Sequence, residues 1–247
     1  MTDQPAIGEE SVRIPVVASP AGRASSGTGR ALEGRLAYPL DHQPVLCSLI
    51  AGPHPLLGGD LQNNVVQALL AGLADAGAVA LAFNYAGVGR SEGGPADWPA
   101  IVSAFWRDGR FDEERLWVED AAAALTFLRR SHDRCPVLIG YSFGCWTAVN
   151  NLHAADPAAV VLISPNPTQH TFDALGDFDG PLLVVHSNND FSCAETDLVA
   201  WFETLRPPKS RVLIRAGEHF FRGEEREVVG TVLAFLRDNH LLEAPAA

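Results

Sequence analysis

Residues 137–146 read VLIGYSFGCW and predict a strand that turns abruptly into a helix. The apolar run at 137–139 suits a buried strand, and the residues after Ser142 continue with helical spacing. Ser142 stands between Gly140 and Gly144, in the pattern Gly-x-Ser-x-Gly. Five-residue matches arise by chance, but a strand before and a helix after are the context in which this pattern presents a nucleophilic serine. Whether Ser142 is a nucleophile therefore depends on the partners that the rest of the chain supplies.

Apolar runs alternate with amphipathic segments along most of the chain. Asp60 is expected to cap the first helix and Gly77 to end it. Strands that alternate with helices predict an α/β fold with a mostly parallel sheet, helices on both faces and antiparallel strands at the N-terminus. The predicted strands are 11–17, 32–39, 44–52, 78–85, 136–140, 158–164, 181–187 and 211–215, and the predicted helices are 61–77, 117–132, 142–154, 194–206 and 226–240.

Two segments interrupt this pattern. Residues 18–31 are rich in glycine and serine and are expected to form a hairpin loop or an excursion. Residues 94–116 fit no simple crossover and are longer than most connections in such folds. We expect 94–116 to be an insertion or lid near the carboxyl ends of the strands, where ligands bind in open α/β sheets. Since neither a linker nor an internal repeat is evident, we predict a single domain over residues 1–247.

The composition limits the classes of partner. The chain has 247 residues and a net charge of -12, with Lys209 as its only lysine. Nucleic acids and anionic membranes need clustered positive charge, so we expect neither as a partner. Acidic residues at the N-terminus do not resemble a secretory signal, and no apolar run reaches the roughly 18 residues that span a bilayer. The expected location is cytoplasmic.

The cysteines do not predict a metal site. Cys47, Cys135, Cys145 and Cys193 are scattered, without CxxC or Cys/His metal spacing. We therefore expect neither a metal nor an organic cofactor.

Two later strands are followed by residues that can activate a serine. The strand at 181–187 leads into Asp190, and the strand at 211–215 leads into His219. Both residues are expected at the sheet edge from which Ser142 emerges, in the order serine, acid, histidine. A serine hydroxyl needs a base, and the base needs an orienting acid. His153, His186, Glu195, Asp197 and Glu218 are less well placed in the predicted elements.

From about residue 44 to the C-terminus, the chain resembles the α/β-hydrolase superfamily, most closely a group of small bacterial α/β-hydrolases that are dienelactone-hydrolase-like or esterase-like. Four stretches carry the likeness: GPHPLLGG at 52–59, FNYAGVGRSEG at 83–93, GYSFG at 140–144 and HFF at 219–221. The resemblance implies that Ser142 is the nucleophile, Asp190 the acid and His219 the base. Gly52 departs from the family loop, which usually starts with histidine at that position.

The expected oxyanion hole has two backbone donors. One is the N–H of Phe143, the residue after the nucleophile. The second should come from the loop after the strand at 44–52, where Pro53 and Pro55 have no N–H. The choice lies mainly between His54 and Leu56, and the alignment of this loop with the family favours His54.

The predicted function is that of a serine hydrolase which forms an acyl-enzyme on a small-molecule carboxylic ester or related acyl substrate. Candidate substrate-binding residues are Leu56, Tyr141, Trp98, Phe105 and Trp106, although aromatic residues more often serve packing. Two other functions stay open. One is an acyltransferase with the same triad, and the other is a non-catalytic binding protein with this fold.

Overall fold

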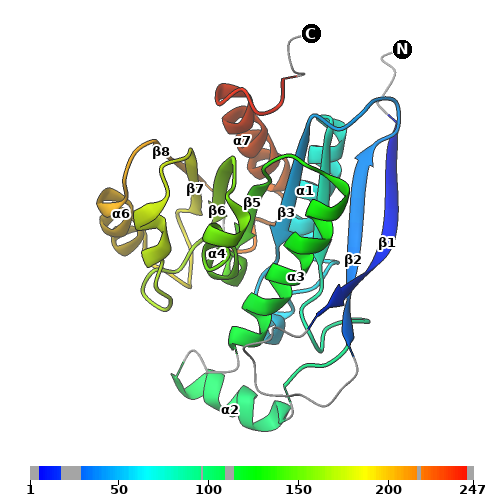
Figure 1. Ribbon diagram of the computed structural model, residues 1–247. Helices are drawn as coiled ribbons and strands as arrows, with labels where there is room; N and C mark the ends of the chain where they lie inside the picture. Colours follow the sequence, from blue (N-terminus) through cyan, green and yellow to red (C-terminus); the bar gives the residue numbers. More distant parts are fainter. Residues whose placement is uncertain (1–5, 18–28, 96, 109–113, 216–217, 244–247) are drawn as a thin grey trace.

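The computed structural model describes residues 6–17, 29–95, 97–108, 114–215 and 218–243. An eight-stranded sheet runs through the molecule in the order β1-β2-β4-β3-β5-β6-β7-β8 (Figure 1). The pairs β1/β2 and β2/β4 are antiparallel, and all other neighbouring pairs are parallel. The strands are β1 (Ile7–Val16), β2 (Arg30–Pro39), β3 (Leu46–Ala51), β4 (Ala78–Phe83), β5 (Val137–Tyr141), β6 (Ala159–Ile163), β7 (Leu182–Ser187) and β8 (Lys209–Ile214).

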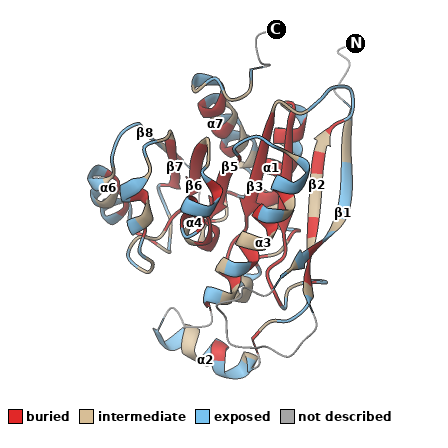
Figure 2. Ribbon diagram, viewed as in Figure 1, coloured by how far each residue is buried: buried red, intermediate tan, exposed pale blue. Residues whose placement is uncertain are grey.

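Helices cover both faces of this sheet. They are α1 (Asn64–Asp75), α2 (Trp98–Asp108), α3 (Arg115–Ser131), α4 (Phe143–Val149), α5 (Leu152–Ala155), α6 (Glu195–Thr204) and α7 (Glu225–Asp238), with short 3-10 helices η1 (Pro55–Leu57) and η3 (Asp173–Asp177). The apolar sides of α1 and α7 pack on one face of the sheet, and those of α3, α4 and α6 pack on the other. Figure 2 shows the buried strands between these two layers. This is the predicted α/β-hydrolase fold, which the structure confirms.

The central strands are buried on both faces because their side chains alternate between the two cores. In β5, Leu138 enters the core beneath α3 and α4, while Ile139 and Tyr141 enter the core beneath α1 and α7. A continuous apolar run such as 137–139 is the sequence expected of such a strand.

Two helix predictions were wrong in detail. Helix α1 is capped by Asn63, whose side chain accepts hydrogen bonds from the N–H groups of Val65 and Val66. Asp60, the predicted cap, instead accepts from Gln62 N–H in the preceding turn. The predicted helix at 142–154 is divided into α4 and α5.

The division falls at a pair of asparagines. The side-chain amide of Asn150 donates to the carbonyl oxygen of Trp146 at 2.8 Å, and that of Asn151 donates to Thr147 at 2.8 Å. Asparagine side chains that bind nearby carbonyls in this way compete with the helical backbone pattern. Apolar periodicity does not detect this competition, so the sequence analysis predicted one longer helix.

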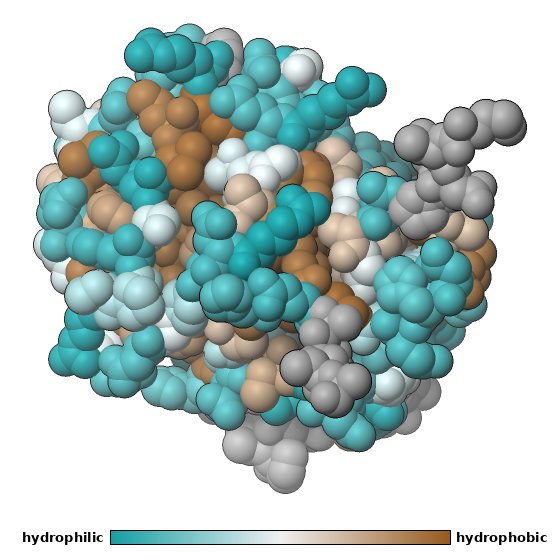
Figure 3. Space-filling model, turned by 90° about the horizontal axis from the view of Figure 1, so that it is seen from above, coloured by the Kyte–Doolittle hydropathy of each residue, from teal (hydrophilic) through white to brown (hydrophobic). Residues whose placement is uncertain are grey.

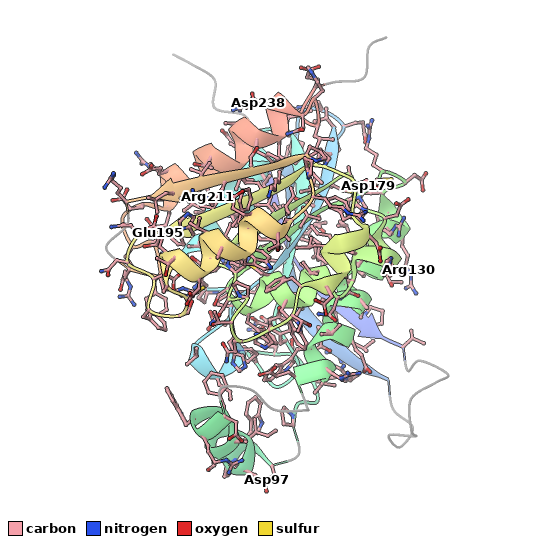
Figure 4. All side chains as sticks on the ribbon, turned by 90° about the vertical axis from the view of Figure 1, so that its left-hand side faces the viewer. Asp97, Arg130, Asp179, Glu195, Arg211 and Asp238 are labelled. Carbon is pink, nitrogen blue, oxygen red and sulfur yellow. The ribbon has the colours of Figure 1, made fainter. Side chains whose placement is uncertain are left out.

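The segment expected as an insertion contains a helix that the sequence analysis did not predict. Asp97 accepts a hydrogen bond from Ala100 N–H at 3.0 Å and so caps α2. Within α2, Ile101 is buried and most other residues are exposed or half-buried. Figure 4 shows this helix, with Asp97 labelled, at one end of the molecule.

The N-terminal hairpin agrees with the prediction. Strands β1 and β2 pair over ten residues, from Ile7 opposite Pro39 to Val16 opposite Arg30. Most of the expected hairpin loop, residues 18–28, lies outside the described residues. Among the described helices, none has the length and apolar character needed to cross a membrane.

Candidate active site

Ser142 occupies a sharp turn between β5 and α4. Its φ of 56° and ψ of -121° are a conformation that residues with a side chain rarely adopt. A Cβ atom on Gly140 would lie 2.4 Å from Cys145 Cα, and one on Gly144 would lie 1.9 Å from the carbonyl oxygen of Ala51. Both glycines are therefore required for the backbone to turn so closely against β3 and α4. The turn projects Ser142 at the carboxyl edge of the sheet.

Ser142, His219 and Asp190 form a continuous hydrogen-bonded chain. Ser142 Oγ lies 2.9 Å from His219 Nε2. His219 Nδ1 lies 2.8 Å from each carboxylate oxygen of Asp190. His219 is buried, whereas Ser142 and Asp190 are half-buried. The three residues predicted from their positions after β5, β7 and β8 are thus brought together in the order that nucleophile activation requires.

A second serine supports the acid. Ser192 N–H and Oγ donate to Asp190 Oδ1 at 2.8 and 2.7 Å, and Ser192 Oγ also lies 3.3 Å from His219 Nδ1. Burial raises the pKa of Asp190, but the bonds from His219 and Ser192 outweigh it and hold that pKa below its usual value. Asp190 is therefore an ionised acceptor for His219. The sequence analysis missed Ser192, although an Asp-x-Ser spacing is typical of a carboxylate that receives local hydrogen bonds.

Tyr141 lies beneath the histidine. Its ring is fully buried and stacks on His219, with the ring centres 5.8 Å apart. Its hydroxyl donates to the backbone carbonyl of His219 at 3.1 Å. Burial raises the pKa of Tyr141, so its hydroxyl keeps the proton that it donates. Tyr141 therefore contacts His219 from within the core beneath α1 and α7.

The loop after β3 is folded around His54. The N–H groups of Leu57 and Gly59 donate to the His54 carbonyl at 2.9 and 3.1 Å. The N–H of Leu56 donates to His54 Nδ1 at 3.1 Å, so the histidine ring caps η1. The ring also packs against that of Phe143 at 4.7 Å. The two residues expected to supply oxyanion donors are therefore in direct contact, and the N–H of Leu56 is already bound.

The other expected substrate-binding residues lie around this loop. Leu56 is half-buried against the core beneath α3 and α4. Trp98 is half-buried close to Gly87, and the ring of Phe105 packs against that of His54 in a tilted arrangement, with the ring centres 4.6 Å apart. Trp106 is 72% exposed on the outer side of α2.

Two further ionisable residues adjoin the site and were not predicted from the sequence. Glu114, just before α3, and His170, in the segment after β6, are joined by a 3.0 Å contact between Glu114 Oε2 and His170 Nε2. Glu114 also approaches the ring of His54, with 3.6 Å between His54 Nε2 and Glu114 Oε1. No motif carried a signal for this pair, because its members lie far apart in the chain.

The residues that the sequence analysis considered less suitable as partners of Ser142 lie outside the triad. His186 Nε2 lies 2.8 Å from Arg211 Nη1, and Arg211 is labelled in Figure 4 together with Glu195 on α6. Glu218 pairs with Arg222 at 3.0 Å. His153 is exposed on α5. Within the described part of the chain, no group of three or more metal-ligating side chains could hold an ion.

A cavity of about 580 Å³ lies at the opposite edge of the sheet. Figure 3 views the end of the molecule away from α2, where hydrophobic side chains show between mostly hydrophilic ones. The cavity is lined by residues that include Leu36, Tyr38, His42 and Val79, which belong to this edge and not to the loops around Ser142. The cavity therefore takes no part in the chemistry of the triad.

Comparison with known proteins agrees with the observed fold. Residues 58–246 match the alpha/beta hydrolase family. An uncharacterized protein of Rickettsia prowazekii is 27% identical over 214 residues, which cover 79% of this chain and 80% of that protein. Among solved structures, an alpha-beta serine hydrolase homologue from Coxiella burnetii matches with a TM-score of 0.72 and 24% identity, over 93% of this chain and 96% of its own.

A protein of unknown function from Agrobacterium tumefaciens matches with the same TM-score of 0.72 and 26% identity, over 92% of this chain and 95% of its own. Esterases from Rhodothermus marinus and Pyrococcus furiosus share the fold at 20% and 14% identity.

Proposed function

Because this chain belongs to the alpha/beta hydrolase family, we propose that it is a serine hydrolase which cleaves carboxylic esters through an acyl-enzyme. The observation that carries the proposal is the 2.9 Å contact between Ser142 Oγ and His219 Nε2, continued by the 2.8 Å contacts between His219 Nδ1 and Asp190. Esterases among the structural neighbours support the choice of substrate class.

The proposed reaction has two steps. In the first, Ser142 Oγ attacks the ester carbonyl while His219 Nε2 takes the hydroxyl proton, and His219 then protonates the leaving alcohol. In the second, His219 takes a proton from water as the water attacks the acyl-enzyme. His219 then returns that proton to Ser142 Oγ as the acyl–oxygen bond breaks, which releases the acid and free Ser142. Asp190, held ionised by its hydrogen bonds, orients the ring of His219 and stabilises its charged form.

In this proposal the backbone N–H groups of Phe143 and His54 stabilise the oxyanion. The Phe143 donor lies at the first residue of α4, where the positive end of the helix dipole also favours negative charge. His54 is preferred to Leu56 as the second donor because the Leu56 N–H is bound by the ring of His54.

The proposed partner is a small-molecule acyl substrate with an apolar part. Phe191 is 68% exposed although its ring centre lies 5.0 Å from that of His219. Trp106 is 72% exposed, and its ring centre lies 5.6 Å from that of Phe105, which contacts His54. Large apolar side chains at the rim of a site are suited to contact with an apolar substrate. We further propose that α2, which is the helix within the predicted insertion at 94–116, covers the path to Ser142.

The test is hydrolysis of p-nitrophenyl acetate and butyrate by the wild-type protein and by Ser142→Ala. The wild type is expected to turn over both esters, and the variant to lose on the order of 10³-fold or more in kcat. A variant that retains wild-type turnover would rule out Ser142 as the nucleophile.

Adding methanol during turnover separates hydrolysis from acyl transfer. A hydrolase releases the free acid as its main product, whereas an acyltransferase forms mainly the methyl ester. A wild-type protein that turns over no ester while binding acyl compounds would favour the non-catalytic alternative.

A further inference from the structure

Glu114 forms a buried ionic cluster with His54 and His170, outside the catalytic triad. Glu114 is 3% exposed and His54 is 4% exposed. Glu114 Oε2 lies 3.0 Å from His170 Nε2, and Glu114 Oε1 lies 3.6 Å from His54 Nε2. Burial raises the pKa of Glu114, but the contacts with the two histidines outweigh it and bring that pKa below its usual value. The cluster therefore contains an ionised carboxylate between two imidazole rings.

The hydrogen bond to His54 Nδ1 determines which ring nitrogen carries the proton. Nδ1 accepts the N–H of Leu56, so in a neutral ring the proton is on Nε2. Burial lowers the pKa of His54 and thereby favours the neutral ring, although Glu114 partly opposes this effect. Nε2 lies 3.6 Å from Glu114 Oε1, which is longer than a hydrogen bond but close enough for electrostatic attraction between the carboxylate and the N–H of the ring.

The position of Glu114 argues against a simple capping role. It is the residue immediately before α3, but its side chain makes no capping hydrogen bond to that helix. An acidic residue at a helix start is ordinarily explained by its contact with the first-turn N–H groups or with the helix dipole. Here the carboxylate faces the two histidines instead. Burying a charge costs free energy, and the contacts with the histidines are the interactions that offset this cost.

The ring of His54 links this cluster to the proposed oxyanion hole. It caps η1 through Nδ1, and its ring packs against Phe143 at 4.7 Å. Rotation of the ring would therefore disturb both the loop that carries the His54 N–H and the side chain of Phe143. If Glu114 holds the ring in place through Nε2, the backbone N–H groups of both His54 and Phe143 are restricted at once.

We propose that Glu114 is a positioning residue which, through the ring of His54, holds the two backbone donors of the oxyanion hole in place, with His170 holding Glu114 from the other side. This inference rests on the proposed hydrolase function and adds to it the group that aligns the oxyanion hole. Such alignment affects the transition state more than the bound substrate, since the oxyanion forms only as the reaction proceeds.

The test compares Glu114→Leu and Glu114→Gln in the hydrolysis of p-nitrophenyl butyrate. Leucine removes the carboxylate at similar size, and kcat is expected to fall about 10- to 100-fold, because a misplacement of up to about 1 Å in the oxyanion donors can cost on the order of 10²-fold in rate. Glutamine keeps a neutral polar group of the same size, and kcat is expected to fall by a smaller factor of about 3 to 10 because the attraction of the carboxylate charge for the His54 ring is lost. KM should stay within about 2-fold in both, as expected when transition-state interactions alone are lost.

A second measurement uses inhibition by propyl trifluoromethyl ketone, which forms a hemiketal with the nucleophile and places an oxyanion in the hole. The inhibition constant is expected to rise by the same factor as kcat/KM falls, in both variants. Glu119→Gln is the matched control, because Glu119 is exposed on α3, the helix that follows Glu114, and its substitution removes the same charge. The control should match the wild type in every measurement.

The proposal is overturned if folded Glu114→Leu keeps kcat within about 2-fold of the wild type, if only KM changes, or if the Glu119 control loses as much activity. Should Glu114→Leu fail to fold, Glu114→Gln decides alone, and an unchanged kcat and inhibition constant refute the proposal. These outcomes presuppose an active wild type. A wild type without esterase activity or reaction with the ketone would instead refute the proposed function, and the inference with it.

Discussion

Gly144→Ala should disable the protein through a single methyl group. The added Cβ would lie 1.9 Å from the carbonyl oxygen of Ala51 and 2.7 Å from that of Gly52. Close contacts between carbon and a carbonyl oxygen are ordinarily about 3.3 Å, so α4 and the end of β3 would have to separate by about 1.4 Å. Both obstacles are backbone atoms, and neither can rotate out of the way.

That separation would move the proposed oxyanion donors apart. Gly144 directly follows Phe143, and Gly52 precedes the loop that carries His54. Because a misplacement of about 1 Å can cost on the order of 10²-fold in rate, we expect kcat for p-nitrophenyl butyrate to fall at least about 100-fold. Overpacking of this kind should also lower the free energy of unfolding by about 1–3 kcal/mol or more.

Gly230→Ala provides the matched control. Gly230 is exposed within α7, and a Cβ there would meet no atom within 4 Å. Alanine is favoured over glycine in a helix by about 0.5–1 kcal/mol, so this variant should be slightly more stable and equally active. Steady-state kinetics and urea denaturation of both variants check the prediction. A folded Gly144→Ala protein with wild-type kcat would refute the geometric account of the turn.

Three further predictions concern two residues near the site and one exposed cysteine. Ser192→Ala removes a hydroxyl that lowers the pKa of Asp190, so the pKa of Asp190 should rise. A carboxyl group whose pKa is lower in the folded than in the unfolded protein stabilises the fold at pH values above the unfolded pKa, and this stabilisation is lost as the pH falls through the folded pKa. Acid unfolding of the variant, followed by circular dichroism, should therefore begin at a higher pH than in the wild type. An unchanged acid midpoint would contradict the role given to Ser192. Phe191→Ser should lower kcat/KM about 10-fold for p-nitrophenyl octanoate and much less for the acetate, because the longer chain has more apolar surface to cover; equal losses on both esters would argue against contact with the acyl chain. Cys135 is the exposed one of the four free cysteines, so a native thiol titration should show one fast-reacting thiol and denaturant should reveal four. More than one fast thiol in the native protein would contradict the burial of the other three.

The positions of Ser142, Asp190 and His219 could be predicted because each follows a strand of the same parallel sheet. Parallel strands end at one edge, so residues just beyond β5, β7 and β8 come close in space although they are far apart in the chain. Apolar periodicity was enough to locate those strands.

The cluster of Glu114 and His170 could not be predicted in this way. Glu114 immediately precedes α3, and His170 lies in the stretch between β6 and β7. Neither position is tied to a strand end or to a helical repeat. Their contact depends on packing around His54, which periodicity does not describe.

Helix α2 is a different case, because its signal was present in the sequence. Asp97 is followed by Trp98 and Pro99, and an acidic cap with proline in the first turn is a typical helix start. The prediction of an insertion at 94–116 rested on length and aromatic content, and it gave no weight to this cap.

Reaction with a fluorophosphonate tests the central claim most directly. The native wild type, incubated with the probe and then digested for mass spectrometry, is expected to carry one phosphonyl group on Ser142. Ser142→Ala should remain unmodified, and His219→Ala should react far more slowly because its serine has lost the base. An unlabelled native wild type, or equal labelling of Ser142→Ala, would contradict the assignment of Ser142 as an activated nucleophile.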